Sequence, residues 1–116
     1  MIYLASPYSH ADEAVRHQRY KAACQAAALL MAEGYRVFSP IAHSHPIEQT
    51  GLFHGSHEWW LAFDFELMRR CDEVYVLAIE GWQESRGVMA EIDEACECDI
   101  PVRIFNLQNG HLVEQL

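Results

Sequence analysis

Apolar stretches of two kinds alternate along the chain. Four are short and continuous, as in buried strands: residues 2–5, 36–40, 73–79 and 102–106. Three are longer and have the spacing of helices: residues 11–34, 58–71 and 84–95. The first predicted helix has Asp12 and Glu13 early and Gly34 at its expected end, and the residues from Gly110 onward are expected to add a strand or a short helix.

This alternation predicts an α/β fold. Strands joined by helices of this length imply right-handed crossovers and a parallel sheet that is covered on both faces. We therefore expect one flavodoxin-like domain over residues 1–116, with a parallel sheet of four to five strands and helices on both faces. Residues 40–57 are expected to form a long irregular loop of the kind that often binds a ligand.

Composition restricts the partners. The chain has 116 residues and is 51% hydrophobic, enough for the core of a single domain. Its net charge of −9 disfavours binding to a nucleic-acid polymer, so a small molecule is the expected ligand. No stretch has the basic and apolar pattern of a signal peptide or a membrane span, which predicts a cytoplasmic protein without a membrane partner. The cysteines are expected to be reduced structural thiols: Cys24, Cys71, Cys96 and Cys98.

The segments that follow the predicted strands mark the expected site. In open α/β sheets, ligands bind outside the carboxyl ends of the strands. Residues 6–10, 39–43, 80–87 and 106 onward are therefore expected to meet at one edge of the sheet. This places Ser6, Pro7, His43 and Trp82 among the candidate binding residues.

The sequence "ESRGVMAEIDEA", residues 84–95, carries the clearest candidate chemistry. Ser85 is a natural N-cap, and Gly87 stands in the first turn, where glycine weakens a helix. Glu91 is four residues after Gly87 and so lies on the same face of the helix. The missing Cβ would clear space beside a carboxylate, next to a helix N-terminus that is suited to an anionic group.

Three motifs in order resemble a known superfamily. They are "IYLASPYS" at the start, D-x7-D-x-V-x-V from Asp64 to Val76, and S-x-G-x-x-x-E from Ser85 to Glu91. Over roughly residues 2–105 they look like the nucleoside 2-deoxyribosyltransferase and nucleotide N-glycosidase superfamily, in a bacterial and phage DUF1937-like branch.

This resemblance implies a role for each matching residue. Glu91 matches the nucleophile that attacks the anomeric carbon, Tyr3 the tyrosine that orients it, and Asp64 the carboxylate that assists departure of the base. Ser85 stands where the transferases carry an aspartate, and members that act on nucleoside 5′-monophosphates carry serine there, with Gly87 allowing the backbone to approach the phosphate. The resemblance also implies no cofactor and a homodimer or higher homo-oligomer.

The chemistry of the residues agrees with these roles. Cleavage of an N-glycosidic bond passes through a cation-like transition state that one carboxylate can trap while another acidic group helps the base to leave. Each residue also has a structural alternative: Glu91 on a solvated acidic helix, Asp64 turned outward, Tyr3 in the core, and Ser85 as an N-cap alone.

The aromatic and basic candidates have alternatives of the same kind. Trp59, Trp60 and Trp82 could stack on a base, or serve core packing or a subunit interface. Arg86 could pair with a phosphate or lie on the surface.

Two other functions remain open from the sequence. Four histidines within residues 43–57 could hold zinc or another metal: His43, His45, His54 and His57. Their spacing matches no recognised ligand pattern, so we expect no metal and histidines that line the nucleotide pocket instead. The other alternative is a nucleotide sensor that binds without turnover.

Overall fold

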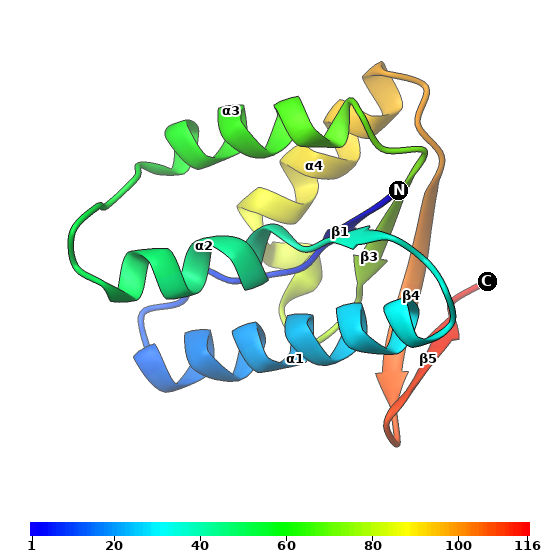
Figure 1. The fold of residues 1–116 in the computed structure, drawn as a ribbon, viewed down its shortest axis with the longest axis horizontal. Coiled ribbons are helices and arrows are strands. Elements are labelled where there is room, and N and C mark those ends of the chain that lie inside the picture. The colour runs from blue at the N-terminus through cyan, green and yellow to red at the C-terminus, as the bar shows by residue number, and fades with distance from the viewer.

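The computed structural model describes residues 1–116 as a five-stranded sheet between layers of helices (Figure 1). The strands are β1 Ile2–Ala5, β2 Val37–Phe38, β3 Glu73–Leu77, β4 Val102–Gln108 and β5 His111–Glu114. Their order is β2-β1-β3-β4-β5; the first four are parallel and β5 is antiparallel to β4. The α/β prediction is confirmed, and the parallel part comprises four strands in the order of doubly wound sheets.

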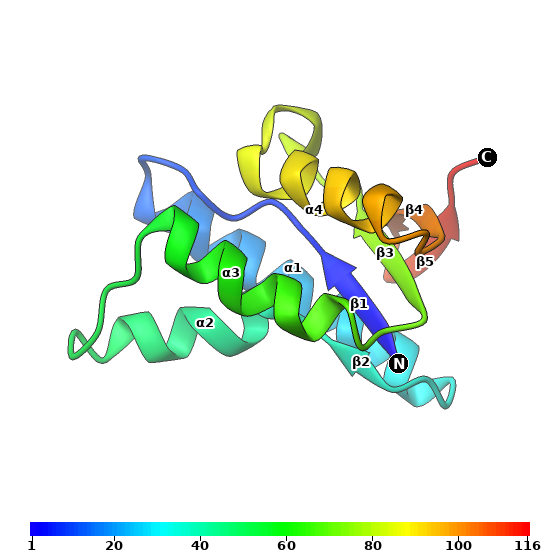
Figure 2. The same ribbon diagram turned by 90° about the horizontal axis from the view of Figure 1, so that it is seen from above.

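Four α-helices and one short 3₁₀ helix connect the strands. They are α1 Glu13–Ala32, α2 Pro40–Gln49, α3 His57–Met68, the 3₁₀ helix η1 Trp82–Glu84, and α4 Arg86–Glu97. Figures 1 and 2 show α1 on one side of the sheet and α3 with α4 on the other, while α2 runs from the end of β2 past the sheet edge. None of the helices has the length and apolar character that a membrane span requires.

Side chains of β1 alternate between the two faces of the sheet and contribute to the hydrophobic core on each face. Ile2 and Leu4 pack with Ala26 and Leu30 of α1, whereas Tyr3 and Ala5 belong to the cluster on the opposite face, with side chains of α3 and α4. Successive side chains of a strand point to opposite faces, so one strand that is apolar throughout fits a sheet covered on both sides.

The predicted helix boundaries have clear local causes. The Asp12 side chain accepts a hydrogen bond from the Ala14 N–H at 2.9 Å and begins α1. Gly34, at φ +99°, lies just beyond α1 and confirms the predicted stop, because a left-handed residue there favours glycine. Ser85 caps α4 in the same way as Asp12 caps α1, by accepting from the Val88 N–H.

Three details of the prediction are wrong. Residues 40–57 are not one irregular loop, because α2 occupies their first half: Ser39 accepts from the Ala42 N–H at 3.2 Å, and Pro40 takes the first helical position, which tolerates proline. The same cap shortens the predicted 36–40 strand to Val37–Phe38. The third detail is strand direction: the tail adds a strand, one of its two expected outcomes, but this strand is antiparallel to β4, so the sheet is mixed rather than wholly parallel. Asn109 and Gly110 both have positive φ and make the tight turn of a hairpin.

Candidate active site

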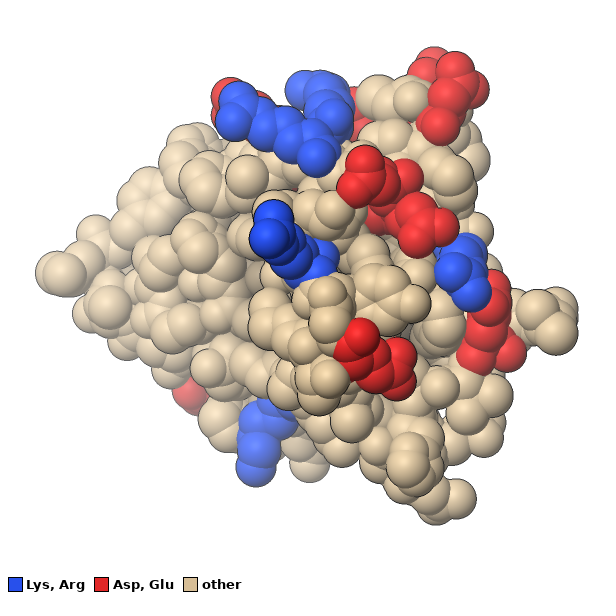
Figure 3. All heavy atoms as spheres, turned by 45° about the vertical axis from the view of Figure 1, so that its right-hand side comes forward, with Lys and Arg blue, Asp and Glu red and all other residues tan.

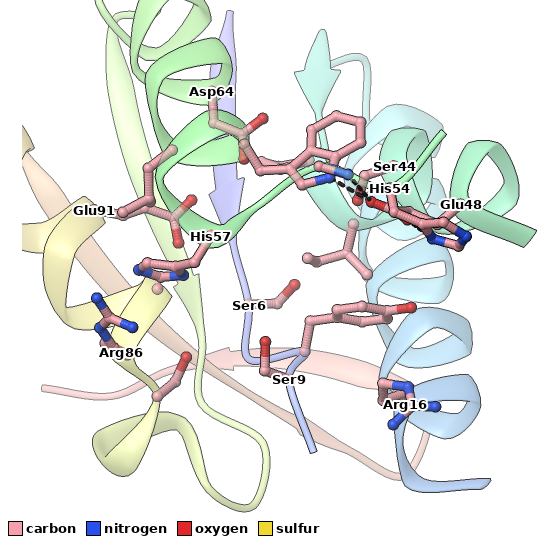
Figure 4. A pocket seen from close by; sticks show the side chains of 18 of the residues that line it. Ser6, Ser9, Arg16, Ser44, Glu48, His54, His57, Asp64, Arg86 and Glu91 are labelled. Carbon is pink, nitrogen blue, oxygen red and sulfur yellow. Dashed lines mark hydrogen bonds and ion pairs between the residues drawn. The ribbon is translucent and has the colours of Figure 1, made fainter. Parts of the chain in front are cut away.

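A cavity of about 640 Å³ lies at the carboxyl ends of the strands. The loop after β1, helices α2 and α3, and the N-terminus of α4 form its walls, as Figure 4 shows. This is the edge at which the sequence placed the site. Six of its candidate residues line the cavity: Ser6, Asp64, Ser85, Arg86, Gly87 and Glu91.

A buried pair from β1 and α4 lies at one wall. The Tyr3 hydroxyl donates a hydrogen bond to Oε2 of Glu91, joining residues 88 positions apart in the chain. Tyr3 is fully buried and Glu91 is 5% exposed. Tyr3 therefore reaches the cavity only through the carboxyl group that it holds in place.

A second buried carboxyl group, that of Asp64, enters the cavity from α3. Asp64 is 8% exposed, and its Oδ1 has no hydrogen-bond partner. Burial raises its pKa from 3.8 to about 7. A buried polar atom without a partner is costly, so this oxygen fits a position that a ligand completes.

The two carboxyl groups influence each other. Burial raises the pKa of Glu91 to about 8; the hydrogen bond from Tyr3 lowers it, and the charge of Asp64 raises it. Burial and the Glu91 charge hold the pKa of Tyr3 well above 10.0, so the phenol keeps its proton. Two carboxyl groups that titrate near neutral pH in one cavity have the properties that acid–base and nucleophilic catalysis require.

The N-terminus of α4 forms the rim of the cavity beside Glu91. A Cβ built on Gly87 would meet only the Ser85 Oγ, at 3.9 Å, so this position opens onto free space. The Arg86 guanidinium is exposed and pairs with Glu58 Oε1 at 3.2 Å, which joins the starts of α4 and α3. The cap residue, the glycine and an arginine thus lie together at one end of the cavity.

The segment after β1 lines part of the cavity. Ser6 is 5% exposed, lines the cavity, and has a hydroxyl without a hydrogen-bond partner. Pro7 is fully buried and is not part of the cavity lining. Of these two candidates, only Ser6 presents a free polar atom to a ligand.

The structure does not bring two other candidates to the cavity. The His43 ring stacks on Phe63, with centroids 5.4 Å apart and an interplanar angle of 13°, outside the cavity wall. Trp82 packs against the core cluster that contains Tyr3. Both follow strands, but a residue on α2 or η1 can face away from the strand ends. Of the other tryptophans, Trp60 lines the cavity and Trp59 is 46% exposed.

The four histidines of residues 43–57 do not converge. His45 shares a hydrogen bond of 2.7 Å with the Tyr8 hydroxyl, and His54 contacts Glu48 at 3.0 Å. His57 lines the cavity on the side of Glu91 and Arg86 (Figure 4). No three metal-ligating side chains of the chain lie close enough together to hold a metal ion.

Sequence reasoning missed another carboxylate in the cavity wall, that of Glu48. Its Oε1 accepts from Trp60 Nε1 at 2.6 Å and from the Gly55 N–H at 3.1 Å. Burial raises its pKa, but these bonds and the one from His54 outweigh burial, so the net pKa is lowered. No sequence pattern joins Glu48 to these partners. The structure shows why residue 55 is a glycine, since a Cβ there would come within 2.6 Å of Trp60 Nε1.

Comparison with known proteins identifies the family and the fold of the chain. The family described as a domain of unknown function, DUF1937, matches residues 1–107. A solved 2-deoxyribosyltransferase from the psychrotolerant bacterium Bacillus psychrosaccharolyticus superposes with a TM-score of 0.62 at 24% identity, over 93% of this chain and 73% of that one. A search of curated proteins gives no match. The likeness to the solved enzyme shows a shared fold, and the predicted DUF1937 membership is confirmed: the chain belongs to the DUF1937 family.

Proposed function

We propose that this protein cleaves the N-glycosidic bond of a nucleoside or nucleotide, as a glycosidase or a deoxyribosyltransferase, with Glu91 as nucleophile. The observation that carries the proposal is the buried Tyr3–Glu91 pair, which opens into the same cavity as the unpartnered carboxyl of Asp64. The fold shared with a 2-deoxyribosyltransferase and the three sequence motifs support the same reaction class.

In the first step, Glu91 reacts as the carboxylate, after its proton has passed to solvent: one of its oxygens attacks the anomeric carbon while the bond from that carbon to the base nitrogen breaks. The transition state carries positive charge on the sugar, which stabilises an ionised Glu91 and lowers the pKa that burial has raised. The Tyr3 hydroxyl favours the same ionised form and fixes the direction of the attacking oxygen.

The leaving base needs a proton, and Asp64 supplies it. Burial holds the Asp64 pKa near 7, and no donor stabilises its ionised form, so about half of the molecules carry the proton at neutral pH. In the second step, water or a second base attacks the same carbon, Glu91 leaves as a carboxylate, and the ionised Asp64 accepts the proton of the attacking group.

The proposed substrate is a nucleoside 5′-monophosphate. Ser85, Gly87 and the first N–H groups of α4 lie at the rim beside Glu91, where the 5′ group of the bound sugar would point. A helix N-terminus favours a phosphate. On the face that Figure 3 shows, basic and acidic side chains are interspersed, without the continuous basic track that a polynucleotide backbone needs.

The proposal includes a cytoplasmic homo-oligomer. Leu52, Phe53 and Trp59 are exposed by 90%, 39% and 46% near the turn between α2 and α3, a surface that a second copy would cover. Light scattering of the purified protein measures its mass in solution and so its oligomeric state.

The test is release of free base from a panel of nucleosides and nucleoside 5′-monophosphates, followed by chromatography. We expect release by the unaltered protein, and a fall of several orders of magnitude in Glu91→Gln with binding retained. The matched control is Glu97→Gln, an exposed position on the same helix, which should keep full activity.

Two results would count against the proposal. Near-normal turnover in Glu91→Gln would remove the nucleophile assignment. If nucleotides bind tightly to the unaltered protein but no substrate of the panel releases base, the protein is a nucleotide sensor instead.

A further inference from the structure

The cavity has two chemically different ends. Glu91, Arg86 and the start of α4 lie at one end, and Glu48 and His54 lie at the other (Figure 4). In the proposed reaction the sugar carbon faces Glu91 and the 5′ group faces α4. The base is the part of the substrate that remains for the end formed by α2 and the start of α3.

Glu48 is a fixed, ionised acceptor at that end. A carboxylate offers about four acceptor positions. Trp60 Nε1 and the Gly55 N–H occupy two positions on Oε1, and His54 Nδ1 occupies one on Oε2. One position on Oε2 remains, on a side chain that is 21% exposed and lines the cavity.

We propose, on the basis of the function proposed above, that Glu48 selects substrates whose base presents an amino group to this end of the cavity. A carboxylate accepts hydrogen bonds and donates none, so it attracts an N–H and repels a carbonyl oxygen. The three donors within the protein hold Glu48 in place before a ligand arrives, so the contact with the base costs little ordering.

Matched pairs of substrates isolate this contact. Guanine and hypoxanthine, adenine and purine, and cytosine and uracil differ at the amino position while the sugar and phosphate stay the same. In at least one pair, kcat/KM for the amino-bearing base should exceed that for its partner by about 10- to 100-fold, the range of a hydrogen bond to a charged group.

The variant Glu48→Gln should bring the cytosine-to-uracil ratio close to one, because the amide can turn its NH₂ toward the uracil carbonyl. It should lower the ratio in a purine pair, because a neutral amide oxygen is a weaker acceptor than a carboxylate. If Glu48 only connects residues 50–56 to α3, the substitution would lower kcat/KM for all substrates by the same factor. The ratio within each pair would then stay unchanged, which would overturn the proposal. Equal release from both members of all three pairs by the unaltered protein would overturn it as well. Glu66→Gln, exposed on α3, is the matched control.

A binding measurement keeps this test separate from the proposed reaction. Calorimetry with the same nucleotides on Glu91→Gln, with and without Glu48→Gln, reads base preference without turnover. A preference for the amino-bearing base that disappears with Glu48→Gln supports this inference even if no base is ever released, and no preference contradicts it even if the unaltered protein is a glycosidase.

Discussion

The buried carboxyl group of Asp64 makes the stability of the domain depend on pH. Asp64 is 8% exposed, and burial is the cause that raises its pKa from 3.8 to about 7. Asp64→Asn keeps the shape of the side chain and removes the charge. The variant should therefore be more stable than the unaltered protein wherever Asp64 is ionised.

The sign follows from the direction of this pKa change. Because the folded-state pKa is raised, the folded state prefers the protonated acid. The free-energy cost of ionising the buried Asp64 is absent below about pH 4, becomes larger between about pH 4 and pH 7 as the unfolded chain loses its proton, and is constant above about pH 7. About 1.4 kcal/mol for each pKa unit gives roughly 4 kcal/mol. Water that enters the open cavity screens the charge, so we expect roughly 2 to 4 kcal/mol.

Urea unfolding of both proteins at about pH 4 and about pH 8 measures this difference. The buried amide of the variant has its own cost, but that cost is the same at both pH values and cancels. Asp93→Asn, exposed on α4, is the control and should change stability equally at the two pH values. A stability difference for Asp64→Asn that does not grow with pH would refute the burial of an unpartnered carboxyl at this position.

Three further substitutions test the site. Gly87→Val should leave the domain folded, because the new Cβ meets only a hydroxyl at 3.9 Å, yet should weaken nucleotide binding in calorimetry; unchanged affinity would place the ligand elsewhere. Tyr3→Phe removes the donor that lowers the Glu91 pKa, so kcat should fall about 10- to 100-fold. The limb of the pH profile that reports Glu91 ionisation should move to higher pH, and a limb that does not move would show that Tyr3 has no influence on the Glu91 pKa. Gly55→Ala places a Cβ within 2.6 Å of Trp60 Nε1 and should destabilise the domain by about 1–3 kcal/mol in urea unfolding, while a neutral effect would mean that the loop relaxes freely.

Local signals explain why most of the fold could be predicted. The stop of α1 needs only Gly34, and the start of α4 needs only Ser85, because caps act within one turn. Helix α2 was missed although Ser39 and Pro40 form a recognisable start. The run from His43 to Pro46, with two histidines, a serine and a proline, interrupts the apolar period of this helix. The helix forms here because it packs against α1.

The site was only partly accessible to sequence reasoning. The resemblance identified Tyr3, Asp64 and Glu91, which periodicity alone could not have joined, since Tyr3 and Glu91 meet across 88 positions. Glu48 escaped because its partners belong to no motif and come together only when α2 and α3 pack against each other.

Hydrogen-bond donors distinguish Glu48, Asp64 and Glu91, three of the four carboxyl groups that line the cavity. Glu48 accepts from three donors and its pKa is lowered, so it is an ionised part of the wall. Asp64 has an oxygen without a partner, and its raised pKa of about 7 leaves it partly protonated near neutral pH. Glu91 has one donor, which deeper burial and the neighbouring Asp64 outweigh, so its pKa is raised and, in the proposed reaction, it must release its proton to solvent before it attacks. Burial therefore costs the folded state free energy at Asp64 and Glu91, whereas hydrogen bonds stabilise the ionised Glu48. In the proposed function, the two costly groups are the ones that contact the leaving base and the sugar, and binding of the substrate offsets their cost.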